Sequence, residues 1–196
     1  YELLGRLEHH DTREATVRTF MRRYHVDTKQ AKRVESLALV LLKQVERQLS
    51  MSFEQAKQTL VWAAKLHEIG ISIAHSGYHK HSAYIVEYAD MPGFSTMEQK
   101  TLGLLMRGQR RSLAKFTLPA MNDDRCLLIL ILRLAILFNR SRSEASKPSI
   151  QLSANLHGFN LAIDAEWLLQ NPLTKAELIS EVSYWKDVNI ALHLMF

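Results

Sequence analysis

Apolar residues recur at helical spacing along most of the chain. The spacing predicts helices over residues 12–26, 28–45, 53–70, 81–90, 96–112 and 124–140. Residues that favour helix N-caps stand before several of these segments, namely Asp11–Thr12, Asp27, Ser52 and Ser95. The last helix is apolar almost all round, so we expect it to lie at the centre of the helical part.

The period of the pattern changes from 3.6 to 2 after a polar segment, residues 141–149, that contains Pro148. Residues 149–154 and 159–164 alternate around a turn at Asn155–Gly158, which predicts a β-hairpin. A helix over 173–185 and a last strand over 188–196 follow. The fold class is therefore mostly α: a helical domain over residues 1–147, then a small α+β domain over residues 148–196.

Composition narrows the class of protein. Of the 196 residues 47% are apolar, and the longest apolar run, Cys126 to Phe138, is broken by Arg133, so we expect no membrane span. The N-terminus shows no signal-peptide pattern, and the single Cys126 suits a reducing cytoplasm. The first residue is Tyr1 rather than Met, which leaves open that the natural protein is longer.

Charge is unevenly distributed along the chain. The net charge is +5, but residues 1–147 carry +8 and residues 148–196 carry −3. An anionic ligand is therefore expected on the helical domain.

Two short segments concentrate the candidate anion ligands. His75, His79, Lys80 and His81 lie within one predicted loop and helix start, where free backbone amides also favour anions. The second segment, residues 107–112, carries Arg107, Arg110 and Arg111, with Lys115 beyond it, and guanidinium groups suit phosphate. The alternatives are a solvated histidine-containing loop and a helix C-terminus whose arginines complement the helix dipole.

His67 and Glu68 stand side by side near the end of a predicted helix. The pair resembles the His-Asp pair of HD-domain phosphohydrolases, where imidazole and carboxylate hold a divalent ion that activates water. Taken alone, the pair is explained better by a polar helix end with His67 bonded to backbone.

The segments around residues 30–34, 81–86 and 133–136 extend this likeness, but the positions of two further ligands hold Gln30 and Ile136. Isoleucine cannot coordinate a metal, and an amide is a poor ligand beside imidazole. We therefore predict an HD-like scaffold with a degenerate metal site at Gln30, His67, Glu68 and Ile136, and no bound metal.

Three longer runs, residues 9–27, 63–95 and 127–142, resemble the C-terminal half of the exopolyphosphatase and guanosine pentaphosphate phosphatase family. The combination LHEIG…HSAYIV…DMPGF is fairly specific, and the form HSGYHKHSAYI is nearer the exopolyphosphatase branch. The resemblance implies cytoplasmic homodimers. It also implies that the catalytic acids and a magnesium site lie in actin-like domains to which nothing in this chain corresponds.

The resemblance implies that this chain is the polyphosphate-binding and dimerisation region of an exopolyphosphatase that releases terminal orthophosphate, inactive alone and without a cofactor of its own. The implied polyphosphate contacts are His75, His79, Lys80, His81, Arg107, Arg110 and Arg111. Specific nucleic-acid binding is not expected. The alternatives are the same region of a guanosine pentaphosphate phosphatase, an independent HD-type nucleotide phosphohydrolase, and a purely structural dimer module.

Overall fold

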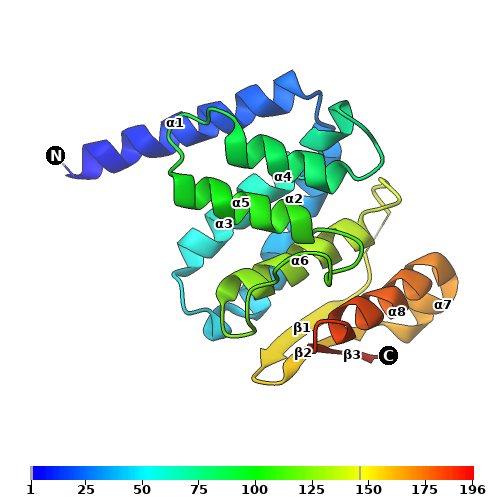
Figure 1. Cartoon of the computed structure of the whole chain (residues 1–196). Helices are drawn as coiled ribbons and strands as arrows, with labels where there is room; N and C mark the ends of the chain where they lie inside the picture. The colour runs from blue at the N-terminus through cyan, green and yellow to red at the C-terminus, as the bar shows by residue number, and fades with distance from the viewer. Residues whose placement is uncertain (1, 146) are drawn as a thin grey trace.

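The computed structural model describes residues 2–145 and 147–196, with side chains described from Thr12 onward. Its helical region contains α1 (Glu2–Arg23), α2 (Thr28–Gln44), η1 (Glu46–Gln48), α3 (Phe53–Leu66), η2 (Ile69–Ser72), α4 (Tyr78–Tyr88), α5 (Thr96–Gly108) and α6 (Asp124–Phe138). The C-terminal region contains β1 (Ile150–Asn155), β2 (Gly158–Ile163), α7 (Ala165–Gln170), α8 (Pro172–Lys186) and β3 (Ala191–Met195). The mostly α fold with a small α+β end is confirmed (Figure 1).

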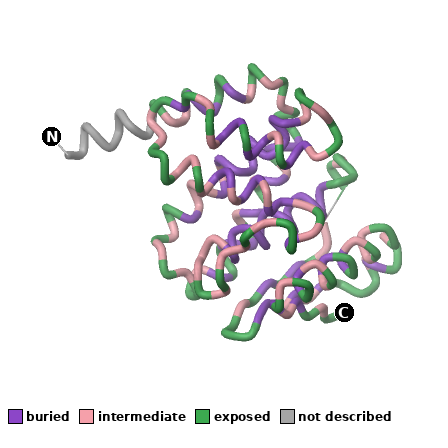
Figure 2. The backbone as a smooth tube through the Cα atoms, viewed as in Figure 1, coloured by how far each residue is buried: buried purple, intermediate pink, exposed green. Residues whose placement is uncertain are grey.

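Helix α6 is the centre of the helical region, as its apolar sequence predicted. Every residue from Cys126 to Phe138 is buried, and α6 contacts α2, α3, α5 and α8 (Figure 2). Three of the four helix N-caps expected from sequence are also formed. Asp27 and Ser52 accept the amides of Gln30 and Gln55, and Ser95 forms a capping box with Glu98.

The C-terminal region is a three-stranded sheet with the order β1-β2-β3. β1 and β2 form the expected antiparallel hairpin, with Ile150 opposite Ile163. β3 pairs with β2 in parallel, which requires a crossover, and α7 and α8 supply it. The rings of Trp185 on α8 and Phe159 on β2 pack 5.3 Å apart, edge to face, and join the helix to the sheet.

Two helix starts differ from the expectation. α1 is continuous through Asp11 and Thr12, because the preceding segment ELLGRLEHH is rich in good helix formers and no cap is needed inside a helix. α4 begins at Tyr78 rather than His81, since Gly77 takes a left-handed conformation with φ 69° and starts the helix three residues earlier. Among the described residues no helix is both long and apolar enough to cross a bilayer.

Contacts cross the division predicted between residues 147 and 148. α6 contacts α8, and α2 contacts β1. The two-domain division itself remains a prediction. What the fold does for the site is to bring the start of α4, the end of α5 and the middle of α6 together.

Candidate functional site

A pocket of about 500 Å³ lies between the start of α4 and the end of α5. We call it the basic pocket; it is lined by Ser76, Gly77, His79, Lys80, Arg107, Arg111, Ser112, Lys115 and Phe116. This lining contains cationic, imidazole and hydroxyl side chains and no carboxylate. Its chemistry therefore suits an anion.

One wall of the basic pocket is the N-terminus of α4. Gly77 is the N-cap and offers no side chain to the first amides of the helix. His79 and Lys80 lie in the first turn, where the helix dipole is positive. The earlier start of α4 thus places both side chains nearer to its free amides than the sequence predicted.

The other wall follows the end of α5, where the chain turns sharply. Arg111 has a φ of 63°, in the left-handed region that side chains other than glycine rarely adopt. Below the turn, Arg133 on α6 donates hydrogen bonds to the carbonyls of Gly108 at 2.6 Å and of Arg111 at 2.8 Å. The backbone that presents Arg111 is therefore held from inside the protein.

Arg133 also links this wall to the C-terminal region. Its Nε and Nη2 atoms each donate to Glu181 on α8 at 2.8 Å, and its guanidinium lies 5.5 Å from the Tyr184 ring centroid. Arg133 is 1% exposed. Arg133 was not among the predicted site residues, although a single arginine within an apolar run indicates a buried charge that needs partners.

The cations around the basic pocket differ in whether they are already paired. Lys80, Arg111 and Lys115 are exposed, and no described carboxylate forms an ion pair with them or with Arg110. Arg110 lies over the Tyr78 ring, 4.6 Å from its centroid. These four side chains keep their charge available to a ligand.

Arg107 is different, because both of its terminal nitrogens contact the Glu87 carboxylate, Nη2 at 2.6 Å. This hydrogen bond raises the pKa of Arg107. Arg107 lines the basic pocket as predicted, but its charge is already neutralised by a partner within the helical region.

His79 is buried and acts as a neutral group. Burial, together with the neighbouring cations Arg110, Lys80 and Arg111, lowers its pKa to about 4. Its Nδ1 atom is buried without a hydrogen-bond partner. At neutral pH His79 therefore offers hydrogen bonding rather than charge.

The other two predicted histidines lie outside the pocket lining. His75 is exposed on the preceding loop, with its ring 6.1 Å from that of Tyr78. His81 is half-buried on α4. Its Cβ lies close to Gly70, since a Cβ added to that glycine would be 2.8 Å from it. The structure therefore places four of the predicted contacts, His79, Lys80, Arg107 and Arg111, in the lining of the pocket. Arg110 lies outside the lining, over the Tyr78 ring and close enough to act electrostatically on His79, and His75 and His81 lie apart.

The residues of the predicted degenerate metal site come from the start of α2, the end of α3 and the end of α6. Gln30 donates to the carbonyl of Asn139 at 2.8 Å and accepts from Arg33, so its amide is already used. His67 contacts the carbonyl of Ala64 through Nδ1 at 2.6 Å, as the helix-end interpretation expected. Ile136 is buried and presents only carbon atoms.

A divalent ion does not fit this arrangement. The Arg142 guanidinium contacts Glu68 and Asp27, so a permanent cation already faces both carboxylates. Among the residues that the structure describes, no three His, Cys, Asp or Glu side chains are grouped to hold a metal. Arg142 was not among the predicted site residues, because it lies in the polar segment after the last predicted helix, where no pattern of residues indicates a partner.

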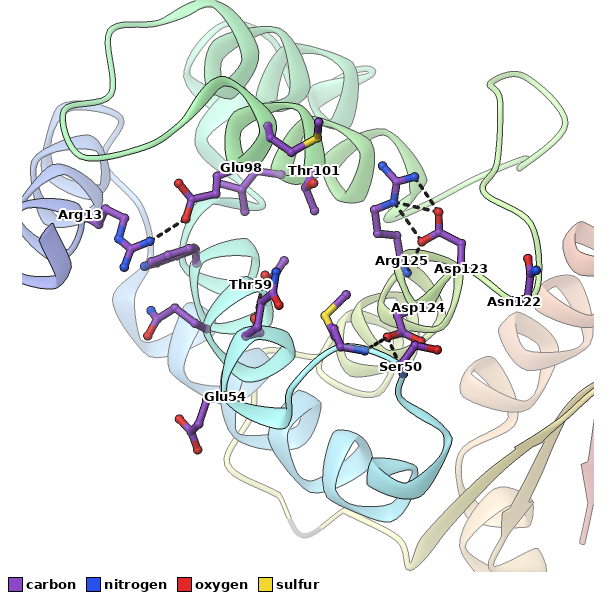
Figure 3. A pocket seen from close by; sticks show the side chains of 16 residues that line it. Arg13, Ser50, Glu54, Thr59, Glu98, Thr101, Asn122, Asp123, Asp124 and Arg125 are labelled. Atoms are coloured by element: carbon purple, nitrogen blue, oxygen red, sulfur yellow. Dashed lines mark hydrogen bonds and ion pairs between the residues drawn. The ribbon is translucent and has the colours of Figure 1, made fainter. Parts of the chain in front are cut away.

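A larger hollow of about 980 Å³ lies elsewhere, among α1, α3, α5 and the start of α6 (Figure 3). Its charges are paired internally: Arg13 with Glu98 at 2.6 Å and Arg125 with Asp123 at 2.6 Å. Asp124 accepts the amides of Ser50 and Met51 (Figure 3). This hollow lacks the unpaired positive charge of the basic pocket.

A family profile and a set of curated relatives both indicate the same protein family. The family profile described as Ppx/GppA phosphatase, domain III, matches residues 12–182. The chain is also similar to curated proteins named guanosine-5'-triphosphate,3'-diphosphate pyrophosphatase. That of Vibrio cholerae is 35% identical over 198 residues, 99% of this chain and 39% of that protein.

Two further relatives carry the same name. That of Vibrio vulnificus is 35% identical over 192 residues, 96% of this chain and 38% of that protein. That of Pseudoalteromonas translucida is 35% identical over 184 residues, 92% of this chain and 37% of that protein. The chain therefore spans less than half the length of the curated relatives it matches.

Proposed function

Because the chain belongs to the Ppx/GppA phosphatase family, we propose that it is the polyphosphate-binding and dimerisation region of a cytoplasmic exopolyphosphatase. In this proposal the basic pocket holds the phosphate chain, and hydrolysis of the terminal phosphate takes place elsewhere in the parent enzyme. The observation that carries the proposal is the basic pocket itself, in which unpaired cations surround a lining without carboxylates.

Polyphosphate is a regular polyanion without a sequence to be read. Its recognition requires separated cations that can contact successive phosphates, not a shape that fits one residue. Lys80, Arg111 and Lys115 offer such charges from two sides of the pocket, and Arg110 adds a fourth charge nearby, over the Tyr78 ring. The amides at the start of α4 add hydrogen-bond donors, and the neutral His79 gives the pocket a polar floor.

This arrangement favours holding the chain over cleaving it. Exposed cations bind phosphate through charge and let it exchange, because each contact is screened by water and salt. In our proposal the parent enzyme also contains actin-like domains with the catalytic acids and a magnesium site, as the family resemblance implies. It forms a homodimer, which extends the basic surface.

The names of the relatives favour a second candidate, the equivalent region of a guanosine pentaphosphate phosphatase. A basic pocket would also suit the clustered phosphates of such a nucleotide. The two candidates differ in the size of the ligand. A long polyphosphate should displace bound guanosine pentaphosphate completely in the first case, and bind no more tightly than a short one in the second.

The test is binding of fluorescent polyphosphate to this chain at several salt concentrations. We expect the affinity to fall steeply with salt, with a slope of log K against log salt near −3 if about four phosphates are neutralised, as for single-stranded polyanions. Lys80→Ala and Arg111→Ala should each weaken binding roughly fivefold to tenfold and make the slope less steep by about 0.7.

The matched control is Lys57→Ala, which removes the same charge from α3, away from the basic pocket. It should leave affinity and slope within error of the unchanged chain. The proposal fails if Lys80→Ala, Arg111→Ala and Lys57→Ala behave alike. Release of orthophosphate by this chain alone would contradict the assignment of catalysis to other domains.

A further inference from the structure

Two carboxylates and one permanent cation meet near the start of α2, the end of α3 and the end of α6. Arg142 Nη1 donates to Asp27 at 3.0 Å, and Nη2 contacts Glu68. The Glu68 side chain is 9% exposed, so it needs a counterion. Asp27 lies at the N-cap of α2, and its carboxylate is also held by the amide of Gln30.

His67 does not supply that counterion. Its Nε2 atom lies 3.9 Å from the nearer Glu68 oxygen and is buried without a hydrogen-bond partner. Burial also lowers the pKa of His67, which keeps the ring neutral at neutral pH. The guanidinium of Arg142 is therefore the cation that faces Glu68 from within this chain.

The backbone at Arg142 adopts a left-handed conformation that residues other than glycine rarely take. Its φ is 52°, although it is not glycine. Its amide donates to the carbonyl of Asn139 at 3.0 Å, which forms a tight turn directly after α6. A strained residue persists where its surroundings hold it, and here two carboxylates hold the side chain.

Arg142 lies in the segment that leads from α6 to β1, residues 139–149, in which residue 146 is not described. We call it the connecting segment. On one side of Arg142, Arg140 contacts Glu177 on α8; on the other, Glu144 contacts Arg33 on α2. Ion pairs therefore attach this segment to both regions of the molecule.

We propose that Arg142 is a built-in counterion for Asp27 and Glu68, beside the residues of the degenerate metal site, and that it fastens the connecting segment to the helical region. The consequence is mechanical: together with the ion pairs of Arg140 and Glu144, this contact helps to set the direction in which the C-terminal region leaves α6. The inference is independent of which anion the basic pocket binds.

Hydrogen exchange of the connecting segment tests the proposal. Arg142→Gln keeps a hydrogen-bonding group and removes the charge. We expect amide exchange in residues 140–145 to become at least about tenfold faster, because the local opening loses its ionic contacts. Arg142→Lys keeps a charge without the planar fork and should give a smaller rise, roughly threefold.

Distances between the two regions give an independent measurement. Spin labels at Thr19→Cys on α1 and Ser183→Cys on α8 occupy exposed positions, and the native Cys126 is fully buried. The distance distribution should broaden in Arg142→Gln and stay narrow in Arg18→Gln, a control that removes an exposed arginine from α1. Unchanged exchange and distances in a folded Arg142→Gln protein would overturn the proposal.

A second variant covers the case in which Arg142→Gln does not fold, since it leaves Glu68 buried without a counterion. Arg142→Gln combined with Asp27→Asn and Glu68→Gln removes all three charges and should restore folding. Its connecting segment should still exchange about tenfold faster than in the unchanged chain. A protected segment in this neutral variant would show that the ionic contact does not fasten it, and would overturn the inference.

Discussion

The basic pocket and the cluster formed by Arg142, Asp27 and Glu68 both contain arginine, and both lie near Tyr78. Arg110 covers the Tyr78 ring, while Arg142 and Glu68 act electrostatically on the Tyr78 hydroxyl. The difference is in what faces the cations. Arg142 contacts two carboxylates, whereas Arg111 and Lys80 contact none among the described residues.

The role of a cationic side chain therefore does not follow from its residue type alone. A guanidinium within reach of carboxylates neutralises them and holds segments together, and its charge is then unavailable to a ligand. A guanidinium on a wall without carboxylates keeps a positive potential that attracts anions. Arg107 shows the intermediate case, because it lines the basic pocket and is nevertheless paired with Glu87.

The largest expected effect concerns Arg133, which holds the α5 wall of the basic pocket from inside the protein. Arg133→Met should destabilise the protein by roughly 3–5 kcal/mol, because it leaves Glu181 buried without a counterion and two carbonyls without donors. Urea unfolding measures the loss. Arg125→Met is the matched control on the same helix; its half-exposed pair with Asp123 should contribute at most about 1 kcal/mol. Equal losses in the two variants would contradict a special role for Arg133.

The next prediction concerns how stability depends on pH through two buried histidines, His79 in the basic pocket and His67 beside Glu68. Burial lowers the pKa of His67, and it lowers that of His79 from 6.5 to about 4. The unfolded chain therefore binds protons that the folded chain does not. Stability should therefore decrease on acidification below about pH 6.5, because the buried rings resist protonation while the unfolded chain takes up protons.

Urea unfolding between pH 7.5 and 5 measures this slope. His67→Gln and His79→Gln should each flatten it, because each removes one ring whose pKa burial lowers. If stability rose on acidification through this range, the neutral state of both rings would be wrong.

The smallest effect sharpens the comparison within the basic pocket. Burial and the surrounding cations lower the pKa of His79, so a bound polyphosphate, which neutralises the cations, should raise this pKa by roughly half a unit to one unit. The NMR titration of the His79 ring with and without polyphosphate measures the change. His67 should respond less, because Arg142 and Glu68 surround it and stay in place. A pKa of His79 that polyphosphate does not move would place the bound anion outside this pocket.

Much of the fold was predictable because it depends on local patterns. The capping residues Asp27, Ser52 and Ser95, the all-apolar α6 and the hairpin around Asn155–Gly158 each act over a few positions. The start of α4 was predicted too late, since the left-handed conformation of Gly77 is one of several that glycine can adopt.

The residue types could be read from the sequence: cations in two short segments, and Gln30 and Ile136 where metal ligands would be needed. How each charge is used depends on the packing of the helices. In the folded chain Arg107 pairs with Glu87, and Arg142 pairs with Glu68 and Asp27, whereas Lys80, Arg111 and Lys115 face a pocket. The physical reason is that a charge is neutralised by groups within a few ångströms of it, and these come from helices far apart in the sequence.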